Sequence, residues 1–316
     1  MVAPLLAERL PRVWGWLPTQ LPTTGLRSGR ELLQWRREQL KAGGTPAELN
    51  WLLEFQGGLP WRELQALHLQ PERSVPLRVP LEEMAALWQR HRLQQEPLQY
   101  LVGCCPWRDL ELQVAPGVLI PRQETELLVD LAEGIARAQG RTPQLWADLG
   151  TGSGCLALAL AQAWPASRGI AVDLSPEALS QAQANLRSQG RLPQVELRQG
   201  DWWTPLRQQW GSLELVVANP PYIPDPIWQE LDPVVRDHEP RLALSSGSDG
   251  LNAIRVIAAG AAEALAPEGW LLLEHHHDQS TAVQQLLLTA GLVEVEAYSD
   301  LEGHARFAVA RRRSDR

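Results

Sequence analysis

The sequence contains few cysteines and no long apolar run, and both shortages exclude classes of protein. Its three cysteines, two of them adjacent at Cys104 and Cys105, form neither a disulfide framework nor the ligand spacing of a zinc site. We therefore expect a reducing, cytoplasmic setting. No stretch approaches the roughly 18 uninterrupted apolar residues of a transmembrane helix, and charge and proline soon interrupt the apolar start of the chain. We expect a soluble protein without a membrane span or a secretory signal.

Positive charge is also scarce, since the net charge at pH 7 is −8. Broad, sequence-independent binding of a nucleic-acid backbone needs clustered Lys and Arg, so an acidic chain argues against it without excluding a local basic groove. Hydrophobic residues make up 44% of the 316 residues, which is enough for one large domain and a smaller one. We expect a monomer that does not bind DNA directly.

Residues 28–97 predict a small helical bundle, which follows an unassigned, proline-containing segment of residues 1–27. Four amphipathic patterns are separated by glycine, proline and threonine signals that start or stop helices. They cover residues 28–43, 45–57, 61–69 and the stretch after Pro80. Short amphipathic helices joined by short loops are typical of a bundle. We interpret it as a substrate-recognition domain, with plain structural support as the alternative.

Residues 98–121 predict a β-hairpin linker. Two stretches of alternating character, Leu98–Val102 and Leu110–Val114, are followed by a proline-glycine turn at Pro116-Gly117 and by Val118–Ile120. The charges of Arg122 and Glu124, just beyond the linker, are interpreted as solvated groups at the start of a helix.

From residue 122 to residue 316 the pattern alternates between short apolar runs and amphipathic helices, which is typical of a parallel, doubly wound α/β sheet. The expected strands are Leu145–Leu149, Ile170–Leu174, Val195–Gln199, Leu213–Ala218, Trp270–Glu274, Val293–Tyr298 and Arg306–Ala310. The expected helices begin near Leu127, Cys155, Pro176, Leu251 and Thr281. The connection between the last two strands is too short for a crossover helix, so we expect these strands to pair antiparallel.

A glycine-rich turn, Asp148-Leu-Gly-Thr-Gly-Ser-Gly154, predicts a cofactor site after the first of these strands. Its glycines allow positive φ angles and a close approach of the backbone to a ligand. The spacing is not the dinucleotide-binding fingerprint, because Cys155 stands where that pattern has its third glycine, and the lysine of a triphosphate-binding loop is missing. Asp173 ends the second strand, where it can accept hydrogen bonds from ribose hydroxyls. Asp201 and Trp202 end the third strand, where an acceptor and a flat ring can hold an adenine. We therefore expect a nucleoside cofactor.

Asn219-Pro220-Pro221-Tyr222 ends another apolar run and predicts a second, polar site. Ligands of open α/β sheets collect outside the carboxyl ends of the strands. Neither proline has an N–H, and both hold φ near about −65°, so the carbonyls of Asn219 and Pro220 can face outward beside the Tyr222 ring. Such a corner suits a planar group with N–H donors, namely a carboxamide or an amino-substituted base.

Together these stretches resemble a known class of enzymes. Asp148–Gly154, Ala171–Asp173, Gly200–Trp202 and Asn219–Tyr222 are similar to the class I S-adenosylmethionine-dependent methyltransferases. Val118–Glu126, Glu239–Leu244 and Gly247–Leu251 resemble, more narrowly, the HemK/PrmC family of protein-(glutamine-N5) methyltransferases, which modify peptide chain release factors. The resemblance covers roughly residues 28–311, including the helical domain and the linker.

The resemblance implies a fold, a cofactor and a substrate. The fold is a doubly wound, mostly parallel sheet with an antiparallel last strand over residues 122–316, preceded by the helical domain. S-adenosyl-L-methionine is the implied cofactor, and its implied contacts are Gly150, Thr151, Gly152, Ser153, Gly154, Asp173, Asp201, Trp202 and Asn219. The implied substrate is the glutamine of a Gly-Gly-Gln loop in release factors, methylated on its side-chain amide nitrogen. The residues that hold it are Asn219, Pro220, Pro221 and Tyr222, with Asn219, Pro220 and Tyr222 as the catalytic group.

One stretch departs from the family, which more usually has a glycine after the residue that corresponds to Glu274. This chain has His275, His276 and His277 there, followed by Asp278. Adjacent positions of a strand point to opposite faces, so we interpret the run as a polar strand end and expect no metal site.

Two other functions stay open. An adenine-N6 DNA methyltransferase can use a similar Asn-Pro-Pro-Tyr corner, because an exocyclic amino group presents the same donors. It would need a basic DNA-reading domain, for which this acidic chain has no candidate segment. A non-catalytic nucleoside-binding module would keep the glycine-rich turn but would not need the corner, which is intact here.

Overall fold

A computed structural model describes residues 25–314 of the chain. The chain divides into two compact units with the boundary between Gln94 and Gln95. Most of the unassigned segment 1–27 lies outside the described residues, and its last three residues belong to the first strand. No helix in the described range has the length and apolar character needed to cross a membrane.

The first unit contains four helices and a two-stranded ribbon. The helices are α1 (Gly29–Lys41), α2 (Pro46–Phe55), α3 (Trp61–Leu69) and α4 (Leu81–Gln94). The ribbon pairs β1 (Gly25–Ser28) antiparallel with β2 (Ser74–Leu77). The four predicted helices are confirmed, while the ribbon was not predicted because its strands are short and one contains a proline.

Helices α1 and α2 begin at the residues that the cap signals indicate. Ser28 accepts a hydrogen bond from the N–H of Glu31, whose carboxylate bonds back to the N–H of Ser28. Thr45 and Glu48 repeat this reciprocal arrangement. Such bonds satisfy N–H groups that the first turn of a helix leaves free. The helices enclose a core that includes Leu32, Leu53, Leu64, Leu67 and Met84.

The second unit begins with a segment that differs from the predicted linker. Leu98–Val102, expected as a strand, forms the short helix α5, which ends at Gly103 in the left-handed conformation. The antiparallel hairpin pairs β3 (Cys104–Trp107) with β4 (Leu110–Gln113). It therefore precedes the turn at Pro116-Gly117, and Val118–Ile120 belongs to no strand. The strand prediction for residues 98–102 is wrong because five alternating residues do not distinguish a strand from one helical turn, and Gly103 supplies the cap of a helix.

A seven-stranded sheet forms the centre of this unit, in the order β10-β11-β9-β8-β5-β6-β7. Its strands are β5 (Leu145–Leu149), β6 (Arg168–Asp173), β7 (Val195–Gln199), β8 (Leu213–Ala218), β9 (Leu265–Glu274), β10 (Val293–Ser299) and β11 (Ala305–Arg311). Strand β11 runs antiparallel to both of its neighbours, and the other pairs are parallel. The predicted mostly parallel sheet with an antiparallel last strand is confirmed.

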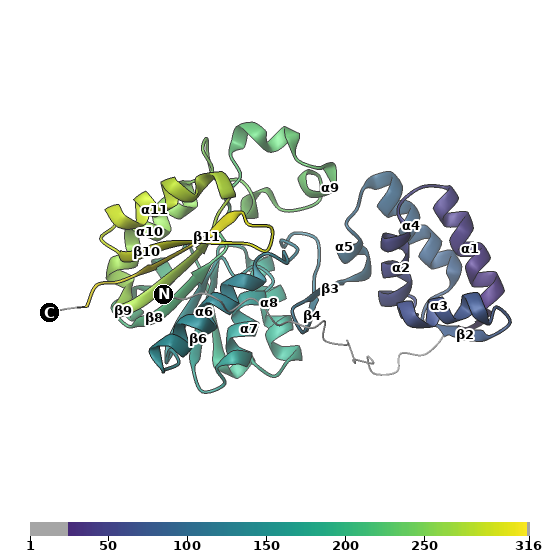
Figure 1. Ribbon diagram of the computed structural model, residues 1–316, viewed down its shortest axis with the longest axis horizontal. Helices are drawn as coiled ribbons and strands as arrows, with labels where there is room; N and C mark the ends of the chain where they lie inside the picture. The colour runs from purple at the N-terminus through teal and green to yellow at the C-terminus, as the bar shows by residue number, and fades with distance from the viewer. Residues whose placement is uncertain (1–24, 315–316) are drawn as a thin grey trace. The chain divides into compact units, whose positions relative to one another are not determined.

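Helices cover both faces of the sheet (Figure 1). One face carries α6 (Glu126–Gln139), α7 (Cys155–Ala163) and α8 (Pro176–Ser188), and the other carries α10 (Asn252–Ala264) and α11 (Ser280–Thr289). Alternate strand residues enter the two layers, so that Trp146 and Val217 pack in one core and Ala147 and Val216 in the other. Burial on both faces explains why the strands read as continuous apolar runs.

The strand order reverses at β5, which lies between β6 and β8. In such sheets the crevice for a ligand opens outside the carboxyl ends of the strands at this point. The glycine-rich turn follows β5, and Asn219 follows β8. The topology therefore places the two predicted sites at neighbouring strand ends.

Candidate active site

The backbone of the glycine-rich turn, which follows β5, is held in place by hydrogen bonds. Gly150, Gly152 and Gly154 have φ angles of +74°, +55° and +80°, a region in which glycine alone is free of strain. The N–H groups of Gly150 and Thr151 both donate to the carbonyl of Val172 on β6, at 2.9 Å. A Cβ atom added at Gly152 would meet nothing within 4 Å. The turn therefore presents bare backbone to a ligand.

Asp173, at the end of β6, closes this turn from the neighbouring strand. Its Oδ2 accepts the N–H of Gly152 at 2.8 Å, and its Oδ1 accepts the N–H of Ser175 at 2.9 Å. Burial raises the pKa of the Asp173 carboxyl, and the two N–H donors oppose that rise. The carboxylate keeps further lone pairs with which it can accept from ribose hydroxyls. Asp173 thus shapes the turn and keeps acceptor capacity for a ligand.

A buried threonine–carboxyl pair lies beneath the turn. Asp148 Oδ2 accepts from the Thr151 hydroxyl at 2.6 Å and from the N–H of Ala157 at 3.2 Å. Asp148 Oδ1 has no hydrogen-bond partner within the described part of the chain. Complete burial raises the pKa of Asp148 to about 7. The pair ties the turn to the first residues of α7.

Asp201 and Trp202 follow β7. The Trp202 ring lies against the turn, because a Cβ atom at Gly150 would be 3.2 Å from it. Asp201 is exposed. Bare backbone at Gly152, a flat ring and two strand-end carboxylates, those of Asp173 and Asp201, suit the adenosine portion of S-adenosyl-L-methionine. The residues present therefore fit the predicted cofactor.

The Asn219 side chain is held by two consecutive hydrogen bonds that end on a buried carboxyl. Its Nδ2 donates to Thr125 Oγ1 at 2.9 Å, and Thr125 Oγ1 donates to Glu274 Oε2 at 2.6 Å. Thr125 precedes α6 and Glu274 ends β9, and both residues are 2% exposed. Burial raises the pKa of Glu274 to about 7, against the effect of its hydrogen bonds.

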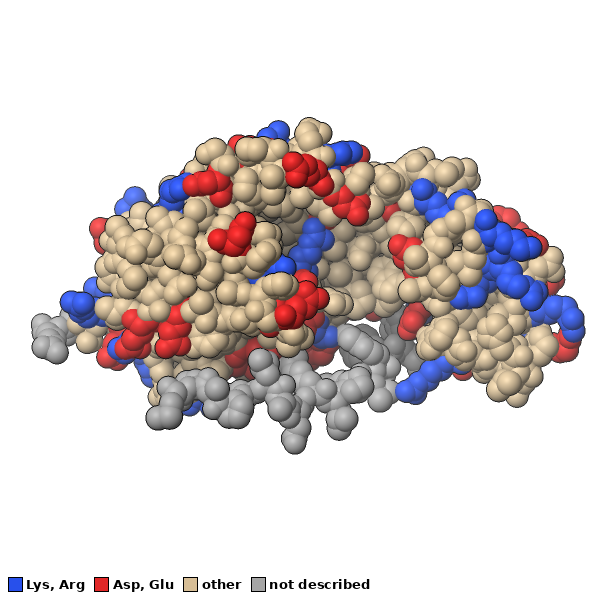
Figure 2. Space-filling model, turned by 45° about the horizontal axis from the view of Figure 1, so that its top comes forward, with Lys and Arg blue, Asp and Glu red and all other residues tan. Residues whose placement is uncertain are grey.

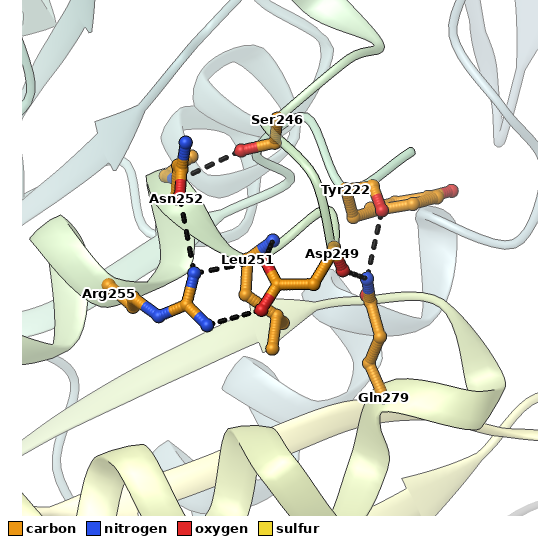
Figure 3. Close-up of polar contacts among 8 residues, drawn as sticks. Tyr222, Ser246, Asp249, Leu251, Asn252, Arg255 and Gln279 are labelled. Carbon is orange, nitrogen blue, oxygen red and sulfur yellow. Dashed lines mark hydrogen bonds and ion pairs between the residues drawn. The ribbon is translucent and has the colours of Figure 1, made fainter. Parts of the chain in front are cut away.

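Tyr222 is held at both its hydroxyl and its backbone. The hydroxyl donates to Glu274 Oε1 at 3.3 Å. The backbone carbonyl accepts from Gln279 Nε2 at 2.9 Å, and the same nitrogen donates to the Asp249 carbonyl at 3.1 Å. Figure 3 shows the Gln279 side chain reaching these two carbonyls together. A Cβ atom at Gly250 would lie 2.1 Å from the Tyr222 oxygen, so glycine is required for this approach.

The corner leaves acceptors that no neighbouring group occupies. Among the described residues, no hydrogen-bond donor reaches the backbone carbonyls of Asn219 and Pro220 or the Asn219 Oδ1. The corner therefore offers side-chain and backbone oxygens to an incoming N–H group.

Arg122 is partly exposed but paired, so its interpretation as a solvated charge is wrong, whereas Glu124 is exposed as that interpretation expects. Its Nη2 lies 2.6 Å from Oε1 of Glu239, whose side chain is 1% exposed. Glu239 Oε2 also accepts the N–H of Ile120 at 3.0 Å. The guanidinium is drawn to Glu239 because a buried carboxylate without a partner is very costly. Beyond the corner, the N–H of Ile223 donates to the carbonyl of Leu244 at 2.8 Å. The stretches Val118–Glu126 and Glu239–Leu244, which resemble the HemK/PrmC family, therefore support the corner.

The histidine run follows β9 instead of continuing the strand. The His276 and His277 rings lie side by side, with centroids 4.2 Å apart, so the prediction that adjacent members point to opposite faces is wrong for this pair. His275 is fully buried, whereas His276 is partly exposed and its Nδ1 lies 2.6 Å from Asp278 Oδ1. Within residues 25–314, no group of three or more His, Cys, Asp or Glu side chains could hold a metal ion.

A family model described as a methyltransferase domain matches residues 147–236, which contain both the turn and the corner. The solved catalytic domain of hMettl16 in complex with MAT2A 3′UTR hairpin 6 has a TM-score of 0.53 at 15% identity, covering 77% of this chain and 86% of that one. A likeness at this identity shows the fold alone. The fold, the family model and the site define the chain as a class I S-adenosylmethionine-dependent methyltransferase.

Two relatives show which family within this class of methyltransferases the chain belongs to. A release factor glutamine methyltransferase of Prochlorococcus marinus is 49% identical over 285 residues, 90% of this chain and 97% of that protein. One of Thermosynechococcus vestitus is 40% identical over 308 residues, 96% of this chain and 98% of that protein. The chain belongs to the release factor glutamine methyltransferase family.

The structure places all the predicted site residues at one edge of the sheet, but not all of their side chains face a ligand. Thr151 and Ser153 are 4% and 2% exposed, so these two residues are buried within the turn. Sequence reasoning missed Thr125, Glu274 and Gln279. Glu274 could have been found by the rule that identified Asp173, since it ends a strand at the same edge.

Proposed function

We propose that the protein transfers a methyl group from S-adenosyl-L-methionine to the side-chain amide nitrogen (N5) of the glutamine in the Gly-Gly-Gln loop of peptide chain release factors. Membership of the family supports the substrate class. The observation that carries the proposal is the corner itself, where Asn219 Oδ1 and the Pro220 carbonyl are free to accept. A primary carboxamide has two N–H groups, one for each acceptor.

The corner compensates for the weak nucleophilicity of an amide nitrogen, whose lone pair is delocalised into its carbonyl. Asn219 Oδ1 and the Pro220 carbonyl each accept one N–H, which fixes the direction of the nitrogen and offsets the positive charge that develops on it. The Tyr222 ring packs on the plane of the amide. S-adenosyl-L-methionine supplies an electrophilic methyl group when it is bound. We assign no general base, because the alkylated nitrogen can release its proton after the transfer.

The cofactor is held by the other half of the site. Gly150–Gly154 contribute backbone, Asp173 accepts from ribose, and Asp201 and Trp202 hold the adenine. These roles follow from the bare turn and the strand-end carboxylates.

We propose that the first unit recognises the release factor, and that the protein acts as a monomer in the cytoplasm, where translation terminates. Deleting residues 1–94 should then raise KM for the release factor and leave S-adenosylmethionine affinity unchanged. Circular dichroism would verify that the truncated chain folds, and calorimetry would measure its cofactor affinity. Unchanged KM in a folded truncated protein would contradict the recognition role.

Methylation of DNA adenine is the competing function for the same corner. A duplex-binding protein needs a continuous basic surface. The second unit, which carries the corner, has more Asp and Glu than Lys and Arg, and on the face drawn in Figure 2 its acidic and basic side chains are interspersed. The charge distribution of this unit favours a protein glutamine.

The deciding experiment offers labelled S-adenosylmethionine and the enzyme to three acceptors in parallel. They are a release factor, the same release factor with its loop glutamine changed to alanine, and duplex DNA. We expect label in the first alone, mapped to the glutamine by peptide mass. Label in the DNA, or equal label in both release factors, would overturn the proposal.

A further inference from the structure

Thr125 and Glu274 are buried against the side chain that orients the substrate amide, yet neither touches substrate or cofactor in the proposed reaction. We infer that Glu274, acting through the Thr125 hydroxyl, determines which end of the Asn219 amide faces the substrate, and that both are positioning residues. This inference rests on the proposed function, because glutamine methylation requires the Asn219 oxygen to face the substrate.

The direction of each hydrogen bond follows from the number of hydrogens available. A threonine hydroxyl has one hydrogen, and an ionised carboxylate can only accept. With Glu274 ionised, Thr125 donates to Oε2 at 2.6 Å and turns a lone pair toward Asn219. Asn219 must then present its Nδ2 to Thr125, at 2.9 Å, and its Oδ1 to the other side.

The reversed amide is excluded for two reasons. It would bring the Asn219 oxygen against Thr125 Oγ1 with no hydrogen between them. It would also turn the Asn219 NH₂ group toward the N–H donors of the substrate. A buried polar contact without a hydrogen costs about 1–3 kcal/mol, which is enough to keep the amide in one orientation.

Protonation of Glu274 would remove this restraint. Tyr222 donates to Oε1 at 3.3 Å, so both oxygens of the ionised carboxylate act as acceptors. A protonated Glu274 donates from one oxygen, which frees the Thr125 hydroxyl to donate to Asn219 and permits the reversed amide.

The charges around Glu274 set the pH of this change. The pKa of Glu274 is raised to about 7 as a net result. Burial, the largest cause, and the charge of Glu124 before α6 raise it, while the hydrogen bonds from Thr125 and Tyr222 and the charge of Arg306 on β11 lower it. Arg306 is itself paired with Asp300, at 2.6 Å. We therefore expect the Asn219 amide to be fixed above about pH 7 and to lose its fixed orientation below it.

Nuclear magnetic resonance tests the inference without any substrate. The chain has four asparagines, so selective ¹⁵N-asparagine labelling yields four side-chain amide pairs, and Asn219→Ala identifies the pair of Asn219. In the parent and in Thr125→Ser these signals should shift with a midpoint near pH 7, and in Thr125→Val and Glu274→Gln that transition should be absent. Signals that titrate identically in the parent and in Thr125→Val would overturn the inference.

Enzyme kinetics provide the second test of the inference. Thr125→Val should lower kcat for the release factor by about 10- to 100-fold, the order of loss expected when a reacting group is misplaced. S-adenosylmethionine affinity, measured by calorimetry, should stay within about twofold, because the cofactor half does not involve Thr125. Thr125→Ser keeps the hydroxyl and should restore most of kcat.

Thr289→Val is the matched control, because it removes a threonine hydroxyl from a different part of the chain. Thr289 is exposed at the end of α11 and donates only to Gln285 of its own helix, at 2.7 Å. Thr289→Val should leave kcat and the Asn219 signals unchanged. A folded Thr125→Val variant with the parental kcat, or Thr125→Ser as slow as Thr125→Val, would refute the positioning role. If the parent itself fails to methylate the release factor, the proposed function fails, and the resonance experiment still decides the inference about Asn219.

Discussion

The two halves of the active site use the same chemical unit but assemble it over very different distances along the chain. Beneath the cofactor turn, Thr151 donates to the buried Asp148, three residues away, at 2.6 Å. Beneath the substrate corner, Thr125 donates to the buried Glu274, 149 residues away, also at 2.6 Å. Burial raises the pKa of each carboxyl to about 7.

The difference decides how far along the chain each half draws its supports. The cofactor half is built from β5, the start of α7, the end of β6 and the end of β7, which follow one another in the chain. The substrate half needs the segment before α6, the end of β8, the end of β9 and the start of α11. The supports of the turn are therefore local, whereas those of the corner come from elements far apart in the chain.

The largest effect is expected from a change at Asn219, the central residue of the substrate half. Asn219→Ala removes one of two acceptors placed where positive charge develops, so kcat should fall by about 10²–10³-fold. S-adenosylmethionine affinity should change less than kcat, because Asn219 is one of several implied cofactor contacts and the turn keeps its own supports. Parallel kcat and calorimetry measurements test this, and an equal loss in both would show that the halves are not separable.

The second prediction concerns Gly250, which contacts the corner but is not part of it. Gly250→Ala places a Cβ atom 2.1 Å from the Tyr222 carbonyl oxygen at a φ of +75°. The corner must move, so we expect kcat to fall by about 10²-fold, as for a displacement of about 1 Å.

Gly291→Ala is the matched control for this change, because its φ is +84° and nothing lies within 4 Å of the added Cβ atom. It should cost about 1 kcal/mol in unfolding free energy from backbone strain, with kcat unchanged. Thermal unfolding of both variants separates strain from the loss of the corner. Equal kcat in the two variants would remove Gly250 from the support of the corner.

The third prediction addresses the cofactor half. Asp173→Ala deletes the acceptor for the Gly152 N–H and for ribose, so S-adenosylmethionine binding should weaken by about 1–3 kcal/mol. Asp173→Asn keeps one acceptor oxygen for the turn and should lie between the parent and the alanine variant. Calorimetry measures both affinities. Unchanged affinity in a folded Asp173→Ala variant would remove this residue from the site.

The smallest effect concerns stability and pH. The folded-state pKa of Glu274, about 7, lies above its unfolded value, so the folded chain binds the proton more tightly. Stability from this group is therefore present at low pH and is lost as pH rises through about 7, by about 1 kcal/mol between about pH 6 and pH 8. Denaturant unfolding of Glu274→Gln should show a shallower decline than the parent. An identical decline of the unfolding free energy in the two proteins would mean that the Glu274 carboxyl does not titrate near pH 7.

Much of the fold could be predicted from the sequence, because periodicity and local start and stop signals depend on near neighbours. The capped helices α1 and α2, the strands of the sheet and the antiparallel pairing of its last strand all follow from such signals. Leu98–Val102 did not, since a single helical turn and a short strand have the same pattern of burial.

The sequence by itself determined the turn with its positive-φ glycines and the corner at Asn219, because both are contiguous motifs at strand ends. Only the tertiary structure decided what holds the corner. Thr125, Glu274 and Gln279 lie 94, 55 and 60 positions from Asn219, and no local pattern pairs residues so far apart. Their hydrogen bonds, and with them the orientation of the Asn219 amide, exist only because β8 and β9 are neighbours in the folded sheet and the segment before α6 crosses their ends.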